Sequence, residues 1–171
     1  MLFRSSKMRE MFVAAPGHVL VDADYSQIEL RLLAHISGDT AMQQAFLSGE
    51  DFHTVTAARV FHVPQDQVTH QMRSRAKAVN FGIVYGISAF SLSQDIGVTV
   101  QEAKEYMDRY FATYTGVRQY MEQVVSQARE RGYVETLWHR RRALPELKSS
   151  NFNMRSFGER VALNMPIQGT A

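Results

Sequence analysis

The sequence predicts an α+β protein that is mostly helical, in which a helical region is inserted into part of an antiparallel sheet. Three observations lead to this fold class. A β-branched run, HVLVDADYS, lies near the start of the chain, and strands favour such residues. Helical periodicity and helix-capping signals then fill the middle of the chain. A second strand-like stretch begins only after Gly132, so the two end segments are expected to share one sheet.

The first expected element is a short buried strand that leads into a helix. The strand covers residues 18–25, and residues 27–36 carry apolar side chains at the spacing of a helix packed behind it. Asp22 and Asp24 lie where the two meet, and because side chains alternate along a strand, both point to the same face. Two hard oxygen ligands could begin a Mg²⁺ site. Turn capping or a salt bridge is the more common role of such a pair, and spacing alone does not separate the two aspartates.

Helices are expected through the middle of the chain, separated by clear breaks. The expected stretches are SGDTAMQQAFLSGED, FHTVTAARVF, Gln67 to Tyr85, SAFSLSQDIG, AKEYMDRYFATY and a further helix that ends near Arg131. Thr99 and Glu102 form a T-x-x-E capping box, which predicts where one of these helices begins. Gly97 and Gly132 are suited to the position just after a helix, and Thr115-Gly116 predicts another break.

After Gly132 the pattern changes to that of a β-hairpin. YVETL and RALPEL flank the basic connection WHRRR, which predicts two short antiparallel strands. Asn151 is expected to cap a final helix through MRSFGERVALN, and Pro166 is expected to break it.

The composition excludes several classes of protein. The chain has 171 residues, a formal net charge of +2 and no cysteine, which excludes disulfides, thiolate zinc sites and cysteine nucleophiles. No apolar run approaches the roughly 18 residues that span a bilayer, and the N-terminus lacks the apolar region of a signal peptide. We therefore expect a soluble cytoplasmic protein without a membrane partner.

One helical face carries an unusual row of side chains at a spacing of four. Its members are Arg73, Lys77, Phe81 and Tyr85. Each step turns about 40° around the axis and advances roughly 6 Å, so one elongated ligand could touch all four. The two cations suit successive phosphates and the two rings suit a sugar and a base, although a solvated basic end with buried rings is the simpler alternative. Gly82 and Gly86 lie beside the row and cost helix stability, so something is expected to approach the backbone closely there.

The longest motifs resemble a known family. DADYSQIELRLLAH resembles motif A of the bacterial DNA polymerase I family (family A DNA polymerases), and RSRAKAVNFGIVYG resembles its motif B, the fingers helix that closes on the incoming nucleotide. GYVETL, the following RRR and ERVALNMPIQGTA resemble the stretch that leads into the palm helix before motif C. The resemblance implies a palm segment with motif A at 1–37, helical fingers with motif B at 38–132, and a hairpin with a return to the palm at 133–171, truncated before motif C.

The resemblance also assigns roles to residues near motif A. Asp24 is implied to be the palm aspartate that binds both metal ions, with the carbonyl of Tyr25 also facing a metal, and Asp22 is then structural. Glu29 matches the steric gate, a side chain that occupies the space a ribose 2′-OH would need. Gln27 lies in the same motif and is expected to reach the nucleotide.

The fingers residues are implied to bind the incoming nucleotide. Arg73 and Lys77 match the residues that hold the triphosphate, and both are expected to act in catalysis by offsetting charge on the phosphates. Phe81 matches the ring against the sugar, and Tyr85 the residue beside the nascent base pair, where it also contacts DNA. His53 matches a histidine near the phosphates, whereas a surface histidine is its ordinary interpretation.

The C-terminal part is implied to bind DNA. The residues expected at the primer-template are Arg160, Asn164 and Gln168, with Arg140 and Arg141 in a local phosphate-binding patch. His139 occupies a place where the family usually has glycine, and Ala143 one where an aromatic residue is common. Without the family, the asparagine and the glutamine would be ordinary capping and turn residues.

The expected activity is template-dependent transfer of deoxynucleotides to a primer 3′-OH by a DNA-directed DNA polymerase. Two Mg²⁺ ions about 3.5–4 Å apart would stabilise the attacking and leaving oxygens, and Lys77 is expected to face Asp24 across the gap that holds the magnesium triphosphate. The partners are primer-template DNA and deoxynucleoside triphosphates, and the full-length protein is expected to be a monomer that acts in replication and repair.

Two alternatives remain beside a polymerase. The sequence contains no His-Asp-Glu tripeptide, the motif C that supplies a second metal-binding aspartate, so the isolated chain is expected to have little or no activity. One alternative is a non-catalytic nucleic-acid-binding helical module, which would bind polynucleotide and ignore triphosphate. The other is a metal-dependent phosphohydrolase, which needs more converging ligands than Asp22 and Asp24.

Overall fold

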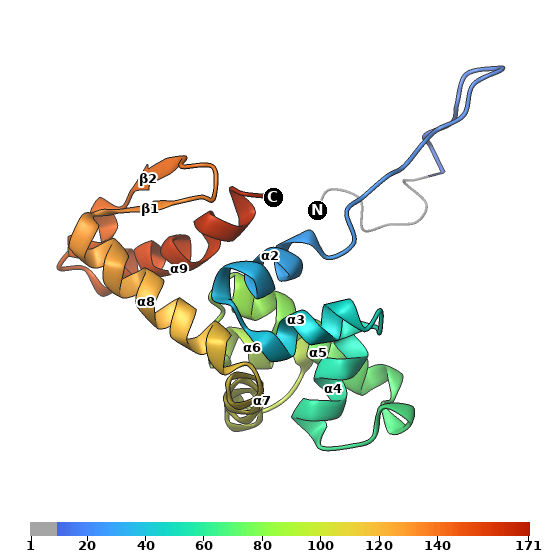
Figure 1. The fold of residues 1–171 in the computed structure, drawn as a ribbon, viewed down its shortest axis with the longest axis horizontal. Coiled ribbons are helices and arrows are strands. Elements are labelled where there is room, and N and C mark those ends of the chain that lie inside the picture. The colour runs from blue at the N-terminus through green and yellow to red at the C-terminus, as the bar shows by residue number, and fades with distance from the viewer. Residues whose placement is uncertain (1–9) are drawn as a thin grey trace.

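The protein is built mainly from helices, with one small hairpin. The computed structural model describes residues 10–171, so the first nine residues of the expected N-terminal segment lie outside it. The helices are α2 (Ile28–Ser37), α3 (Thr40–Leu47), α4 (Phe52–Phe61), α5 (His70–Val84), α6 (Ala89–Ile96), α7 (Val100–Thr113), α8 (Thr115–Arg131) and α9 (Phe152–Gln168). Short 3₁₀ turns cover Gln65–Gln67 and Pro145–Lys148. Strands β1 (Tyr133–Glu135) and β2 (Arg141–Ala143) pair antiparallel (Figure 1), and the mostly helical α+β class is confirmed.

Local capping chemistry sets most helix boundaries where the sequence predicts them. The side chain of Thr99 accepts from the backbone of Glu102, and the Glu102 carboxylate accepts from the backbone of Thr99 in return, so the predicted capping box is present. Gly97 and Gly132 adopt left-handed conformations just after α6 and α8. The side chain of Asn151 caps the start of α9, as predicted. His139, in the hairpin turn, also has a positive φ of 61°, a conformation that glycine adopts more readily.

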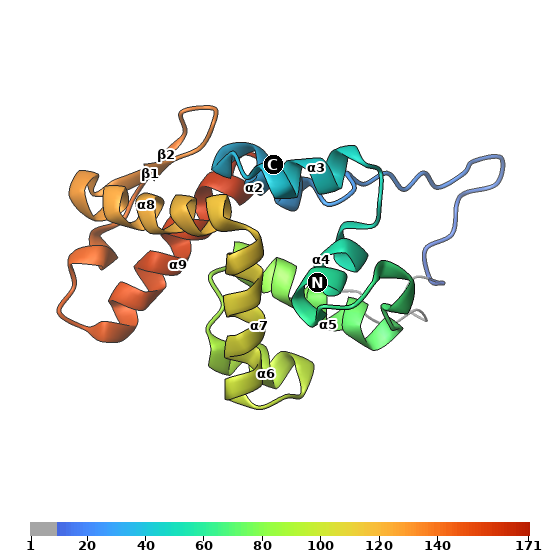
Figure 2. The same ribbon diagram turned by 60° about the horizontal axis from the view of Figure 1, so that its bottom comes forward.

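Two apolar clusters form the core. The larger one joins α2 to α7 and contains fully buried Leu30, Phe52, Tyr110 and Tyr114. The smaller one lies under the hairpin, where Val134 and Leu144 pack with residues of α8 and α9. Helix α8 contributes to both clusters, and Figure 2 shows α7 crossing it at a steep angle. The hairpin and α9 are therefore joined to the other helices through α8 and through Ile167 of α9, which belongs to the larger cluster.

Asp39 links two helices that are distant in sequence. Its side chain is only 4% exposed. Oδ1 accepts from the backbone N–H of Met42 in α3 at 2.8 Å, and Oδ2 accepts from Gly116 in α8 at 2.8 Å. A Cβ on Gly116 would lie 3.0 Å from the Cα of Asp39, so the glycine lets the two segments approach. One carboxylate therefore caps both helices.

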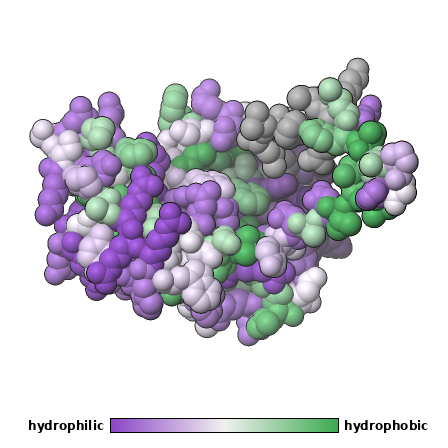
Figure 3. Space-filling view, turned by 90° about the horizontal axis from the view of Figure 1, so that it is seen from above, coloured by the Kyte–Doolittle hydropathy of each residue, from purple (hydrophilic) through white to green (hydrophobic). Residues whose placement is uncertain are grey.

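The predicted strand at 18–25 is wrong for this structure. The segment has no strand conformation, and Val19 and Val21 are 81% and 83% exposed. It forms an arm that extends from the helices (Figure 1) and gathers hydrophobic side chains on its surface (Figure 3). A strand needs a neighbour to pair its backbone groups, and within residues 10–171 the only sheet is β1 with β2. The expectation that both end segments share one sheet is therefore also wrong.

Pro166 does not break the final helix. It lies inside α9, which continues to Gln168. The missing N–H of proline removes one hydrogen bond from the last turn. The continued turn buries Ile167, which is 2% exposed and belongs to the larger apolar cluster. That burial offsets the lost hydrogen bond.

Other side chains approach closely at Gly82 in α5 and at Gly86 just after it, as the sequence predicts. A Cβ on Gly82 would lie 2.6 Å from Cγ2 of Ile87. Gly86 has φ of +64°, and its Cβ would lie 3.0 Å from Cδ1 of Leu163 and 3.4 Å from Cα of Arg160. The approaching element at Gly86 is therefore α9. Within residues 10–171, no helix combines the length and the apolar character needed to cross a membrane.

Candidate nucleotide-binding and nucleic-acid-binding site

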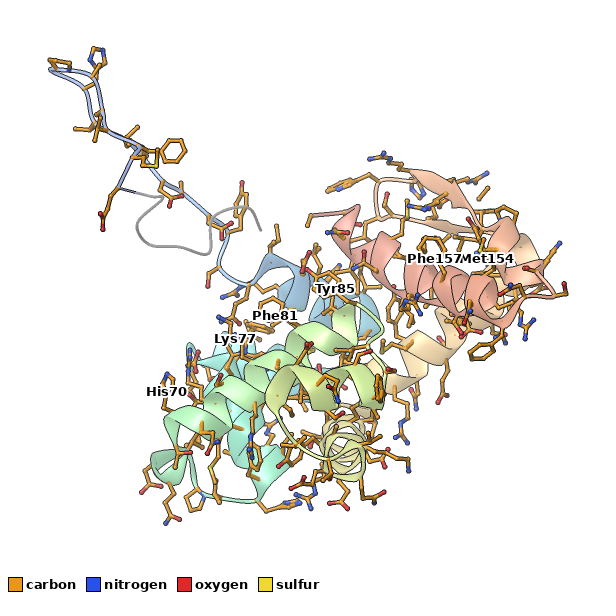
Figure 4. All side chains as sticks on the ribbon, turned by 180° about the vertical axis from the view of Figure 1, so that it is seen from behind. His70, Lys77, Phe81, Tyr85, Met154 and Phe157 are labelled. Carbon is orange, nitrogen blue, oxygen red and sulfur yellow. The ribbon has the colours of Figure 1, made fainter. Side chains whose placement is uncertain are left out.

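The row of side chains on α5 is the centre of the site. Thr69 caps the helix through a side-chain bond to the backbone of Met72. Figure 4 shows Lys77, Phe81 and Tyr85 following one another along α5. The ammonium of Lys77 and the phenol ring of Tyr85 are exposed, and the ring of Phe81 is half-buried. The helix thus presents a cation and two rings in the order that its sequence predicts.

At the cationic end, α4 and α5 bring several charged and polar groups together. Arg73 donates from Nε to Oδ2 of Asp51 at 2.7 Å and from Nη2 to Oδ1 at 3.0 Å. His53 is only 3% exposed, and its Nδ1 accepts from Nδ2 of Asn80 at 3.0 Å. Burial lowers the pKa of His53; the charge of Asp51 opposes this effect, and the positive charges of Arg73 and Lys77 add to it. The lowered pKa favours the neutral imidazole, and with Nδ1 as the acceptor the proton would lie on Nε2.

At the aromatic end, α5 meets α2. The ring of Phe81 lies 5.8 Å from that of His53. The hydroxyl of Tyr85 donates to Oε2 of Glu29 at 2.9 Å, and burial together with this hydrogen bond raises the pKa of Tyr85. Gln27 precedes α2 in a left-handed conformation, and its buried Oε1 has no hydrogen-bond partner within residues 10–171. The structure thus places Phe81 beside His53 of α4, and Tyr85 beside Glu29 of motif A.

The expected DNA-binding residues lie on two neighbouring surfaces of α9. Arg160 lines a cavity of about 540 Å³ together with Phe81 and Tyr85. A second cavity, of about 430 Å³, lies between the hairpin and α9 and is lined by Arg140, Arg141, Arg142, Asn164 and Gln168 among others. Nδ2 of Asn164 is buried and finds no partner in the part of the chain that the structure describes. An unpaired buried donor at the edge of a cationic cavity is suited to an acceptor on a ligand.

Arg141 is less free than the sequence suggests. Its Nε donates to Oε2 of Glu135 at 2.6 Å across the hairpin, and its guanidinium lies 4.8 Å from the centre of the Tyr133 ring. Glu135 also accepts from Nδ1 of His139 at 2.9 Å. Part of the positive charge of the hairpin is therefore balanced locally, which favours Arg140 as the stronger phosphate contact.

Asp24 and Tyr25 lie on the exposed arm just before α2. Among residues 10–171, no three His, Asp or Glu side chains come together as a metal-binding group. The carboxylate of Asp24 and the adjacent carbonyl of Tyr25 are hard oxygen donors of the kind that Mg²⁺ accepts, and this ion keeps several waters and takes phosphate oxygens as further ligands. The donor types fit magnesium, while the site within this range is incomplete.

Sequence reasoning missed Asp51 and Asn80. Both act through other residues: Asp51 holds the Arg73 guanidinium, and Asn80 fixes the ring of His53. The signal for Asp51 is present in the sequence, since an aspartate directly before FHTVTAARVF is a helix N-cap. Its second role depends on a contact across 22 positions, which no local pattern reveals.

A protein-family model and several curated relatives match most of the chain. The family model described as DNA polymerase family A matches residues 3–171. DNA polymerase I of Geobacillus stearothermophilus is 55% identical over 166 residues, and that of Bacillus subtilis (strain 168) is 57% identical over 166 residues. Each match covers 96% of this chain and 19% of the relative, so the chain spans about a fifth of the length of these proteins.

A solved structure matches as well. It is described as the POL domain of Pol1 from M. smegmatis in complex with DNA primer-template and dNTP, and it superposes with a TM-score of 0.81 at 50% identity over 86% of this chain and 26% of that chain. These matches identify the chain as part of a polymerase domain. The chain belongs to DNA polymerase family A.

Proposed function

We propose that this chain supplies the fingers and part of the palm of a DNA-directed DNA polymerase that adds deoxynucleotides to a primer 3′-OH under template direction. The observation that carries the proposal is the convergence of Arg73, Lys77, His53 and Phe81 on one face of α4 and α5. In this proposal residues 38–132 form the fingers, residues 10–37 belong to the palm with motif A, and residues 133–171 return to it. Family membership and the solved relative with primer-template and dNTP support the assignment.

The side chains have distinct tasks in the proposed reaction. Lys77 and Arg73 bind the triphosphate and offset the negative charge that builds on it as the primer 3′-OH attacks the α-phosphate and pyrophosphate leaves. His53 donates from Nε2 to a phosphate oxygen. Asp24 and the carbonyl of Tyr25 would hold Mg²⁺, which when bound stabilises the attacking and leaving oxygens.

Substrate choice and DNA binding involve the aromatic end and α9. Phe81 lies against the sugar, and Gln27 contacts the nucleotide through its unpaired carbonyl oxygen. Glu29, held by the Tyr85 hydroxyl at 2.9 Å, fills the space that a ribose 2′-OH would need, so deoxynucleotides are selected. Tyr85 lies beside the nascent base pair. The remaining DNA contacts are those of Arg140, Arg141, Arg160, Asn164 and Gln168, and the full-length protein acts as a monomer in the cytoplasm.

Nucleotide binding tests the proposal. A fluorescent deoxynucleoside triphosphate with Mg²⁺ is expected to bind this chain, and a fluorescent single-stranded oligonucleotide without a 5′-phosphate is expected not to compete for the same residues on α5. Chemical-shift changes in ¹⁵N-labelled protein identify the residues involved. Binding of the oligonucleotide alone, with no response to triphosphate, would instead favour a non-catalytic nucleic-acid-binding module.

The isolated chain is expected to catalyse little or no primer extension. Within residues 10–171 no cluster of three metal-binding side chains forms, and two divalent ions need more carboxylate charge than Asp24 provides. A primer-extension assay with Mg²⁺ and all four deoxynucleotides measures this, with DNA polymerase I of Bacillus subtilis as the positive control. Robust synthesis by the isolated chain would contradict the expectation.

A further inference from the structure

We propose that Asp51 is a positioning residue for the triphosphate, which orders the guanidinium of Arg73 in advance of binding. The inference rests on the proposed function of the α5 row. Asp51 occupies both Nε and Nη2 of Arg73, at 2.7 Å and 3.0 Å. Nη1 of Arg73 donates to no group within residues 10–171 and is therefore available to a phosphate oxygen.

The carboxylate is itself fixed by the first turn of α4. Oδ2 of Asp51 accepts from the backbone N–H of Thr54 at 2.9 Å and from its hydroxyl at 2.6 Å. The same oxygen then accepts from Arg73 on α5. A rigid helix end therefore sets the position of the guanidinium on the neighbouring helix. This contact also adds to the extensive packing between α4 and α5.

Ordering an arginine before binding has a measurable benefit. A free arginine side chain loses much of its rotamer entropy when it is fixed in one geometry. In this structure that cost is met in the unliganded protein by a two-point contact with matching planar groups. The side chains of Arg73 and Asp51 are 42% and 36% exposed. The pair therefore lies at the surface, where a phosphate can reach it.

The charge of Asp51 acts in the opposite direction. A carboxylate close to a triphosphate repels it, and it also offsets part of the attraction by Arg73 and Lys77. His53 adds no charge here because burial keeps it neutral. If electrostatics dominated, removal of the carboxylate charge would tighten binding; if positioning dominates, as we propose, removal weakens it. The direction of the change therefore decides between the two effects.

The decisive variant is Asp51→Asn. Asparagine is as good an N-cap as aspartate, so α4 keeps its first turn, while the ion pair with Arg73 loses its charge and one acceptor. We expect the dissociation constant of magnesium dATP to rise about three- to tenfold, within the range set by the ordering of one arginine. The matched control is Asp108→Asn, which makes the same change in an exposed aspartate of α7 that pairs with Lys104 at 3.5 Å, and it is expected to change binding less than twofold.

A second readout follows the guanidinium itself. In ¹⁵N spectra the Nε–H signal of Arg73 is expected to be resolved and protected from exchange in the wild-type chain and in Asp108→Asn, and to exchange rapidly in Asp51→Asn. In an Arg73→Lys background, Asp51→Asn is expected not to weaken binding, because only the repulsion by the carboxylate is then removed. A merely structural role of Asp51 would weaken both backgrounds equally.

The outcomes separate this inference from the proposed function. Failure of the wild-type chain to bind magnesium dATP contradicts both. Binding by the wild type with unchanged or tighter binding by Asp51→Asn overturns the positioning role alone, as does an Nε–H signal that is equally protected in both proteins. Thermal unfolding of each variant, followed by circular dichroism, excludes loss of fold as the cause.

Discussion

Replacing Lys77 with alanine is expected to weaken binding of magnesium deoxynucleoside triphosphate by about 10- to 100-fold, the range of one lost hydrogen bond between charged groups. Lys77 is exposed on α5, and the shift that its charge produces in the pKa of His53 shows that the two groups are close. The substitution removes an ammonium without opening a cavity in the core, and alanine favours a helix. Loss of affinity should therefore occur without loss of stability.

The control for this prediction is Lys104→Ala. Lys104 is also an exposed helical lysine and forms a 3.5 Å pair with Asp108 within α7. Lys104→Ala lowers the net charge by the same amount as Lys77→Ala, but Lys104 lies outside the α5 row. Titration of a fluorescent triphosphate should give a wild-type dissociation constant for this variant. Equal weakening by both substitutions would mean that net charge, rather than a defined phosphate contact, drives binding.

Replacing Asp39 with alanine is expected to lower the free energy of unfolding by about 2–3 kcal/mol, since one substitution removes two helix caps. The backbone N–H groups of Met42 and Gly116 would lose their acceptor in a buried environment, and buried donors without partners are costly. Urea unfolding followed by circular dichroism measures the change.

Asp108→Ala provides the comparison for Asp39→Ala. Asp108 is exposed and, within residues 10–171, pairs only with Lys104 at 3.5 Å, so its loss should change stability by less than about 0.5 kcal/mol. Asp39→Asn should also destabilise the fold, because an amide keeps one acceptor but cannot accept at both positions. A stability of Asp39→Ala within about 0.5 kcal/mol of wild type would show that the shared cap contributes little.

The helices could be predicted because their boundaries depend on nearby residues. The bonds between Thr99 and Glu102 span three positions, and the left-handed turn at Gly132 depends on that residue alone. The arm at 18–25 has equally strong strand-forming residues, but a strand is completed by a partner that local sequence does not specify. The predicted break at Pro166 is wrong for a related reason, since the burial of Ile167 depends on the distant larger cluster.

Only part of the candidate site could be predicted from local sequence. A spacing of four is enough to predict that Lys77, Phe81 and Tyr85 follow one another on one helix. The bond between Tyr85 and Glu29 joins residues 56 positions apart, and that between Asn80 and His53 joins residues 27 apart. Such contacts depend on how α2, α4 and α5 pack. The role of Asp24 stays a prediction that follows from motif A.

The packing of α5 at its two ends has a mechanical consequence. Gly86 lies tightly against α9, whereas Arg73, about 20 Å away along the axis at 1.5 Å per residue, is fastened to α4. Each end of α5 is thus held by a different helix. A displacement of α4 or of α9 would therefore be passed along α5 over about 20 Å, from one end of the proposed site to the other.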